Sequence, residues 1–276
     1  MPEFLPLYTL ADQPAILAVP ELGGLECLQA GTGREPLAAH FHEEWVIGVN
    51  TTGEQHFDHR GSRHVSGPGW LTTINPEDVH ACYGGAQQWH YVSYHLSPVF
   101  VRTLADEIGA ASLPRFAGST VEDAGMARRL LGLFLVLAGS DCPLQRETGL
   151  LETFAELAQR HMQGRAAAPL LHTSLARARD RLADALDDEI TLQLLADDCG
   201  LSRWQFCRLF REQYGLAPLQ WRKQLRVMRS RQLLRRGLAP GEVAVQLGFA
   251  DQPHFTRAFK GAFGVTPARY QRGFAG

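Results

Sequence analysis

The chain contains few cysteines, and their arrangement excludes a disulfide framework and a zinc ribbon. Its 276 residues include five cysteines, an odd number, and these are scattered without a C-x-x-C pair. Paired cysteines cross-link small secreted domains, whereas isolated cysteines are typical of proteins in a reducing compartment. We therefore expect a cytoplasmic protein.

Long apolar segments are also missing. The longest apolar run, residues 130–138, is too short to cross a bilayer, which requires roughly 20 apolar residues. The first ten residues, MPEFLPLYTL, lack the basic region that precedes the apolar stretch of a signal peptide. The sequence also has no nucleophile elbow, phosphate loop or carboxylate pair. We expect no membrane partner and no enzymatic activity.

The charged residues are divided unevenly between the two parts of the chain. The overall net charge is −2, but residues 170–276 carry 17 Lys and Arg against 10 Asp and Glu. The preceding residues carry 10 basic against 19 acidic side chains. The length exceeds what one hydrophobic core usually serves, so two domains are expected. The imbalance indicates that only the second domain binds a polyanion, although two soluble domains can also differ in charge without functional meaning.

The first domain is expected to be β-rich. Between residues 11 and 96, short apolar or alternating segments are separated by glycine-rich and Asn-Pro turns, and strands are predicted at 45–49, 70–74 and 89–94. Many short strands at close spacing favour a sandwich or small barrel. Apolar residues then recur at i, i+3, i+4 and i+7 within residues 122–163, which predicts two flanking helices. These helices either cover the β structure or pair with a second subunit.

A segment of small residues and proline, GRAAAP at 164–169, is the expected linker. The predicted domains are therefore 1–165, for sensing and dimerisation, and 170–276, for DNA binding. The expected fold class is α+β, with a β-barrel and flanking helices followed by an all-α domain.

The last third of the chain contains one pattern twice. Residues 191–214 and 242–263 each read as a short apolar helix, a glycine-containing turn, a capping residue and a second amphipathic helix. This is the sequence form of a helix-turn-helix. A G-x-x-P break follows each copy, at 215–218 and 264–267, which supports an internal duplication. A long helix at about 219–235 joins the copies and would span roughly 25 Å, at about 1.5 Å per residue.

In each copy, the second helix has one apolar face and one face suited to DNA. After the predicted cap Ser202, Phe206 and Phe210 form the packing face of the first copy. On its other face, an arginine can make two hydrogen bonds to a guanine edge. The alternative is a solvated basic face on which Trp204 covers a hydrophobic edge. In the second copy, Asp251 is expected to cap the helix, with recognition of a cytosine amine as the alternative.

The final domain resembles that of the AraC/XylS family of bacterial transcription regulators. The resemblance rests on ADDCGLSRWQFCRLF at 196–210, LRVMRSRQLL at 225–234, VAVQLGFADQPHFTRAFK at 243–260 and GVTPARY at 264–270. It implies two helix-turn-helix units in consecutive major-groove segments, and a protein located at the nucleoid through DNA binding. Its implied partners are double-stranded DNA, RNA polymerase, a small-molecule effector and a second copy of the chain. The implied regulator is an activator of transcription.

The resemblance also assigns the candidate DNA contacts by position. The implied base-reading residues are Trp204, Cys207 and Arg208 in the first copy, and Gln252, Pro253, His254, Thr256 and Arg257 in the second. His254 can instead be a surface residue. Basic residues near these faces and on the connecting helix are expected to contact phosphates, which contribute affinity without sequence choice. These phosphate candidates are Arg203, Arg211, Arg222, Lys223, Arg226 and Lys260.

Eight of the 11 histidines lie between residues 40 and 95. The segments HFHEE at 40–44 and NPEDVH at 75–80 resemble the two motifs of the cupin barrel, which is the sensory domain of many AraC-type regulators. The effector-binding candidates are His40, His42, Glu44, Trp45, His80 and Trp89.

The histidines also allow a metal site. In a metal-binding cupin, the two histidines of H-x-H, a later glutamate and a distant histidine bind the ion. Here apolar residues replace the usual glutamate, so Glu44 would have to substitute. The candidate ligands are His40, His42, Glu44 and His80, a set that suits Zn, Ni, Fe or Mn. Three interpretations remain open: histidines that hydrogen-bond in an organic-effector pocket, a metal-sensing regulator, and a metal-dependent enzyme with a DNA-binding tail.

Overall fold

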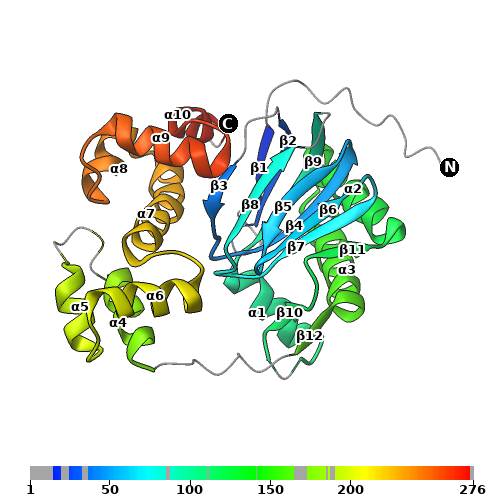
Figure 1. Ribbon diagram of the computed structural model, residues 1–276. Coiled ribbons are helices and arrows are strands. Elements are labelled where there is room, and N and C mark those ends of the chain that lie inside the picture. Colours follow the sequence, from blue (N-terminus) through cyan, green and yellow to red (C-terminus); the bar gives the residue numbers. More distant parts are fainter. Residues whose placement is uncertain are drawn as a thin grey trace. The chain divides into compact units, whose positions relative to one another are not determined.

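The computed structural model describes residues 15–19, 25–32, 37–84, 88–110, 112–140, 142–164, 173–184, 186 and 190–273. The chain forms two compact units, one comprising Met1–Ala38 and His42–Ala166 and the other comprising Ala39–Phe41 and Ala167–Gly276. The described strands all lie within residues 15–164, and the described elements from residue 173 onward are all helices (Figure 1). The predicted fold class is confirmed. Most of the predicted linker lies outside the described residues.

Two sheets build the first unit. The larger sheet has the order β1-β2-β9-β4-β7-β11, and all its neighbouring strands are antiparallel. Its strands are β1 (Ala15–Val19), β2 (Leu25–Thr32), β4 (Trp45–Thr52), β7 (Trp70–Ile74), β9 (Trp89–Leu96) and β11 (Thr120–Glu122). The second sheet has the order β3-β8-β5-β6, from β3 (Leu37–His40), β5 (Gln55–His59), β6 (Ser62–Ser66) and β8 (His80–Gly84). Two short strands, β10 (Pro114–Phe116) and β12 (Met162–Gly164), pair separately.

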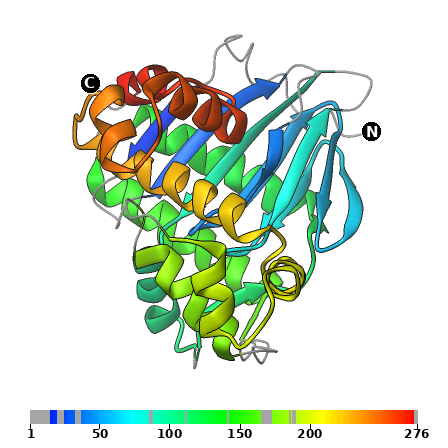
Figure 2. The same ribbon diagram turned by 60° about the vertical axis from the view of Figure 1, so that its left-hand side comes forward.

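Three helices cover one face of the larger sheet: α1 (Pro98–Glu107), α2 (Ala124–Gly139) and α3 (Pro143–His161). Both views show α2 and α3, in green, along this face (Figures 1 and 2). Successive residues of a strand point to opposite faces, and Ile47 and Tyr94 point to the helices. They share a core with Leu130, Phe134 and Phe154. Burial of each such side chain contributes about 1.5–3 kcal/mol.

The other face of the larger sheet is mixed, since it carries polar side chains beside a small apolar cluster that includes Val46 and Ile74. The opposite phase of β4 carries Gly48 and Asn50, and the opposite phase of β9 carries Ser93 and His95. Asn50, Ser93 and His95 are nevertheless buried. Because the helices cover the apolar phase, these polar residues face away from the main core, on the inner side of the β structure.

The second unit contains seven described helices: α4 (Thr173–Asp184), α5 (Leu192–Asp198), α6 (Arg203–Tyr214), α7 (Pro218–Arg235), α8 (Pro240–Gln246), α9 (Gln252–Phe263) and α10 (Pro267–Arg272). The duplication extends to individual hydrogen bonds of the turns. Leu201 N donates to Ala196 O at 2.9 Å, and Phe249 N donates to Ala244 O at the same distance. Each turn also needs a left-handed glycine, Gly200 or Gly248, with φ of 66° and 67°. Two helix-turn-helix units, α5–α6 and α8–α9, follow from these matched turns.

None of the described helices is long and apolar enough to span a membrane.

Candidate DNA interface and sensory site

The recognition helix α6 begins with a complete capping box. The Ser202 side chain accepts from Gln205 N, and the Gln205 side chain accepts from Ser202 N at 3.1 Å. Phe206 and Phe210 are fully buried, as predicted from their spacing. This anchoring leaves Trp204 exposed, with 71% of its surface accessible.

Trp204 and Arg208 form one surface on α6. The Arg208 guanidinium lies 5.4 Å from the centre of the Trp204 ring and donates to Glu212 Oε1 at 2.8 Å. The Arg208–Glu212 spacing of four residues is the signal in the sequence, because residues i and i+4 are neighbours on a helix. Glu212 was not among the residues expected from the sequence. A guanine edge that binds Arg208 would have to replace this carboxylate.

The second recognition helix, α9, begins at the predicted cap. Asp251 Oδ1 accepts from His254 N at 2.6 Å, so this carboxylate caps the helix. Phe255 and Phe259 are buried, and the His254 ring lies edge-on to Phe249 with centroids 5.5 Å apart. The other predicted base-reading residues of this helix are exposed or partly exposed: Gln252, Pro253, Thr256 and Arg257. In α6, Cys207 is partly exposed. The base-reading roles remain predictions.

Two of the predicted phosphate contacts are instead placed inside the domain. Arg222 is only 7% exposed. Arg226 donates from Nε and a terminal nitrogen to Leu186 O, and from the other terminal nitrogen to Gly248 O at 2.7 Å. The expectation that these two residues face phosphates was wrong. The remaining candidates are exposed: Arg203, Arg211, Lys223 and Lys260.

Other arginines of α7 also serve the fold. Arg229 donates to Ala183 O at 2.9 Å, in the last turn of α4. Arg231 and Arg235 both donate to the Tyr270 hydroxyl, at 3.2 and 3.1 Å. Carbonyls at a helix C-terminus have no partner within the helix and carry partial negative charge, so guanidinium groups stabilise them. The basic composition of α7 therefore reflects its central position as much as any contact with DNA.

In the β-rich unit, one predicted pocket residue belongs to the core. Trp45 is 3% exposed, packs in the core shared with the helices and donates from Nε1 to Pro114 O at 3.0 Å. The prediction that Trp45 contacts an effector was wrong because its phase in β4 points to the helices. Trp89, in contrast, points to the inner side of the β structure. It lies on the inward phase of β9 and stacks on Tyr91, with ring centroids 4.6 Å apart. Burial raises the pKa of the Tyr91 hydroxyl.

Histidines from distant segments meet at one end of this inward phase. Ligand atoms of His42, Glu44 and His95 all lie within 4.8 Å of one another. The His42 ring centre lies 5.2 Å from that of His80 and 5.0 Å from that of His95. His95 was not among the residues expected from the sequence, although alternation along residues 89–95 is the signal that could have identified it.

Glu44 reaches this cluster from a bend and not from a strand. Residues 41–44 are not part of a strand, and Glu43 and Glu44 form a bend before β4. The bend brings Glu44 to His42 and His95.

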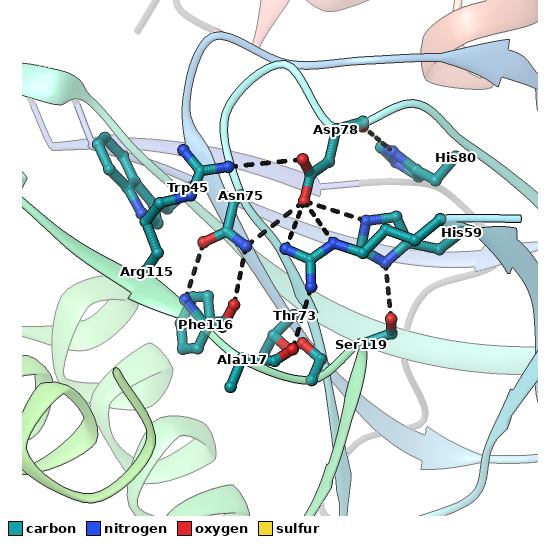
Figure 3. A network of polar contacts seen from close by, with 12 residues as sticks. Trp45, His59, Thr73, Asn75, Asp78, His80, Arg115, Phe116, Ala117 and Ser119 are labelled. Carbon is teal, nitrogen blue, oxygen red and sulfur yellow. Dashed lines mark hydrogen bonds and ion pairs between the residues drawn. The ribbon is translucent and has the colours of Figure 1, made fainter. Parts of the chain in front are cut away.

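A network centred on Asp78 fixes the loop between β7 and β8 (Figure 3). Asp78 Oδ2 accepts from Arg60 at 2.9 Å and from His59 at 3.2 Å, and Arg115 lies 3.5 Å from Oδ1. Asn75 exchanges two hydrogen bonds with the Phe116 backbone, at 2.8 and 3.0 Å. Burial acts to raise the pKa of Asp78, but the His59 hydrogen bond and the nearby positive charges outweigh it and lower that pKa.

The network includes a Ser–His–Asp chain, since Ser119 Oγ lies 2.8 Å from His59 Nδ1. The Asp78 carboxylate in this chain is also held by two arginines, and the His59 ring is almost completely buried. Such an arrangement orders the loop and does not present a nucleophile to a substrate.

The network positions the histidine cluster. Asp78 O accepts from His80 Nδ1 at 3.1 Å, as Figure 3 shows, and His42 O accepts from Glu77 N at 2.8 Å. Glu77 adopts φ of 65°, which is uncommon for a residue other than glycine. The two segments that carry His42 and His80 are thus bonded to each other through their backbones.

Two sequence families match this chain, one in each part. The family described as an AraC-like ligand binding domain matches residues 22–154, and that described as a helix-turn-helix domain matches residues 195–273. The transcriptional regulator YbfI of Bacillus subtilis is 26% identical over 78% of this chain and 80% of its own length. The arabinose operon regulatory protein of Salmonella typhimurium is 23% identical over 83% of this chain and 84% of its own.

Solved structures support the same fold. ToxT from Vibrio cholerae superposes with a TM-score of 0.59 over 90% of this chain and 97% of its own, at 12% identity. The matching families and relatives are transcription regulators and not enzymes, which agrees with the prediction from the missing catalytic motifs. The chain belongs to the AraC/XylS family of DNA-binding transcription regulators, with an AraC-like ligand-binding domain preceding its two helix-turn-helix units.

Proposed function

We propose that this protein is a dimeric transcription activator, controlled by a small organic effector that binds on the inner side of the β-rich domain. One observation carries the proposal: buried polar side chains share the inward phase of the larger sheet with a small apolar cluster, while the opposite phase forms the main apolar core. Burial of polar groups costs free energy unless they are hydrogen-bonded, so a polar inner face needs a reason. Recognition of a ligand provides one.

The inner face has the mixed character of a ligand site. Asn50 Nδ2 donates to Ser66 O at 2.6 Å, and Thr72 donates to Gln55 Oε1 at 2.8 Å. Trp89, further along β9, adds an aromatic surface on the same phase as Ser93. Ligand sites typically combine apolar and aromatic walls with a few placed polar groups. A ToxT structure is described as bound to an unsaturated fatty acid, which supports ligand binding by a domain of this fold.

The output side follows from the two helix-turn-helix units. We place α6 and α9 in consecutive major-groove segments about one turn, ~34 Å, apart. Activation through RNA polymerase is favoured by the relative RhaS of Escherichia coli, named as a transcriptional activator, which is 33% identical over 93 residues. Dimerisation would use the outer faces of α2 and α3, whose inner faces are buried in the core. The protein would act in the bacterial cytoplasm, on DNA of the nucleoid.

The proposal is tested with full-length protein, DNA from upstream of its own gene and a panel of small organic molecules. Thermal shift identifies a binder, and fluorescence anisotropy then measures DNA affinity with and without it. Ser93→Val replaces one inward hydroxyl with a larger apolar side chain, and Thr103→Val, which removes a hydroxyl on the exposed side of α1, is the control. We expect Ser93→Val to retain basal DNA binding and lose the effector response, and Thr103→Val to retain both.

Two results would contradict the proposal. Failure of the protein to bind any upstream fragment would exclude the regulatory role. An unchanged effector response in Ser93→Val, together with an unchanged response when Asn50 is replaced by leucine, would exclude the inner face as the effector site. A strictly monomeric protein at all concentrations, measured by light scattering, would exclude the dimer.

A further inference from the structure

We propose that the β-rich domain binds a divalent transition metal ion through His42, Glu44 and His95, with His80 beside them as a further nitrogen donor. Metal binding itself is independent of the function proposed above, whereas any effect of the metal on DNA affinity rests on that function. This ligand set differs from the one expected from sequence. Its carboxylate comes from the bend before β4, and His95 comes from β9, outside both histidine motifs.

The donor atoms lie close enough to share one ion after small adjustments. One ligand atom from each of His42, Glu44 and His95 lies within 4.8 Å of the others. Zinc lies about 2.0–2.1 Å from imidazole nitrogen and about 2.0–2.2 Å from carboxylate oxygen, so two ligands on one ion lie roughly 3–4 Å apart. Side-chain movements of about 1 Å would bring the ligand atoms from 4.8 Å to the separation of ligands on one ion. The three histidines are buried and Glu44 is partly buried.

The hydrogen bonds of two histidines match those of metal ligands. His80 Nδ1 lies 3.1 Å from Asp78 O, and a carbonyl oxygen can only accept, so Nδ1 carries the proton. With the proton on Nδ1, the neutral form of the His80 ring has its lone pair on Nε2. Ser93 Oγ lies 3.3 Å from His95 Nε2, which assigns Nδ1 as the ligand atom of His95. Metal-binding histidines almost always use their second nitrogen in this way, and the bond fixes the tautomer and the ring orientation.

The cluster is also held by its surroundings. Glu77 N donates to His42 O at 2.8 Å, which joins the segment of His42 to the β7–β8 loop that carries His80. Asp78 anchors that loop through His59, Arg60 and Arg115. Ligands placed on supported segments lose less conformational entropy when an ion binds. The Asp78 network would therefore hold His80 in place for metal binding.

The donor chemistry restricts the ion. Imidazole nitrogen and a carboxylate suit Zn, Ni, Fe and Mn, whereas soft thiolate ligands, which favour Cu(I), are not among His42, Glu44, His80 and His95. Affinity for divalent ions in such a site rises from Mn through Fe to Ni. We therefore use Zn²⁺, Ni²⁺ and Co²⁺ as probes, with Co²⁺ reporting its ligands through its visible absorption.

The experiment uses full-length protein without a histidine tag, because a tag would itself bind these ions. Protein treated with chelator is loaded with each ion, passed over a desalting column and analysed by elemental mass spectrometry. We expect about one equivalent per chain and a Co²⁺ spectrum with nitrogen and oxygen ligands. His42→Ala should retain less than a tenth of an equivalent. Glu44→Gln and His95→Ala should bind more weakly by well over the 10–100-fold that loss of a supporting partner typically causes.

His56→Ala is the matched control, because His56 lies on β5 as a partly exposed residue, 3.5 Å from the Glu54 carboxylate. It should bind the ion as the wild type does. Glu44→Gln guards against misfolding, since it is nearly isosteric, and circular dichroism verifies every variant. Less than a tenth of an equivalent in folded wild-type protein would overturn the inference, as would equal losses in His56→Ala and His42→Ala.

DNA affinity, measured with and without the ion, separates binding from regulation. A change of about 5-fold or more that His42→Ala abolishes supports a regulatory metal. An unchanged affinity, with the ion bound, overturns the regulatory role and leaves the metal site in place. Absence of DNA binding in both forms would contradict the proposed function, and the metal stoichiometry would still decide the site.

Discussion

Arg226 provides the sharpest test of the difference between folding and DNA contact in the second unit. Its guanidinium donates to two backbone carbonyls, Leu186 O beyond the end of α4 and Gly248 O in the turn between α8 and α9. It thus connects α7 to a segment before the first helix-turn-helix and to the turn of the second. We predict that Arg226→Ala destabilises this domain before it affects any DNA contact.

The magnitude follows from the bonds that are lost. A hydrogen bond that involves a charged group contributes about 1.5–3 kcal/mol, and both carbonyl acceptors lose their guanidinium. Water can reach part of this half-buried site, so we expect a net loss of about 2–4 kcal/mol for the domain. For a domain of about 100 residues, this lowers the melting temperature by roughly 10–20 °C.

Differential scanning calorimetry of the full chain measures this effect, because the two units can unfold in separate transitions. Hydrogen exchange then localises it, and we expect faster exchange at Gly248 and Phe249. Arg226→Lys keeps the charge but cannot span two carbonyls, so it should recover only part of the stability. Gly248→Ala disturbs the same junction independently, since a Cβ there would lie 2.9 Å from the Arg226 guanidinium at φ of 67°.

Lys223 is the control for a phosphate contact on the same helix, because it is exposed. If Arg226→Ala melted within about 1 °C of the wild type and lowered DNA affinity equally for all sequences, the structural role would be refuted. That result would support the prediction from the sequence that Arg226 contacts a DNA phosphate.

Three further predictions concern the recognition surface and the β-rich unit. Arg208→Ala should lose roughly 1–3 kcal/mol of binding and relax specificity at one base position, whereas Lys223→Ala should weaken binding to all sequences and reduce the salt slope by about 1; indistinguishable profiles from binding-site selection would contradict this. Glu212→Gln removes a carboxylate bonded to Arg208 and should raise DNA affinity several-fold in low salt, so a loss of affinity in anisotropy titrations would show that Glu212 positions the arginine. The lowered pKa of Asp78 stabilises the folded state above the unfolded value of about 3.9, and this contribution is lost as pH falls through the folded pKa. Asp78→Asn should therefore have a lower melting temperature than the wild type near neutral pH, and its melting temperature should fall less as the pH is lowered. Melting temperatures that fall in parallel for both proteins would count against the network.

The sequence by itself determined the helix-turn-helix units. Their features are local: apolar residues at helical spacing, a glycine in each turn, and the caps Ser202 and Asp251 placed before each recognition helix. Hydrogen bonds between residues three or four apart depend on sequence spacing alone, so helix starts and buried faces could be predicted. The repeated pattern strengthened each prediction, because the second copy obeys the same rules as the first.

Tertiary structure decided which side chains reach which partners. Arg226 and Lys223 belong to the same basic helix, and only the positions of Leu186 and Gly248 separate a structural arginine from an exposed lysine. Trp45 and Trp89 both lie in strands, and the helices that cover one face of the larger sheet decide that Trp45 belongs to the core. His95 joins His42 and Glu44 because strand order, and not sequence distance, places β9 beside β4. Local hydrogen bonds and periodicity are encoded in neighbouring residues, whereas burial and the meeting of distant side chains depend on the whole chain being folded.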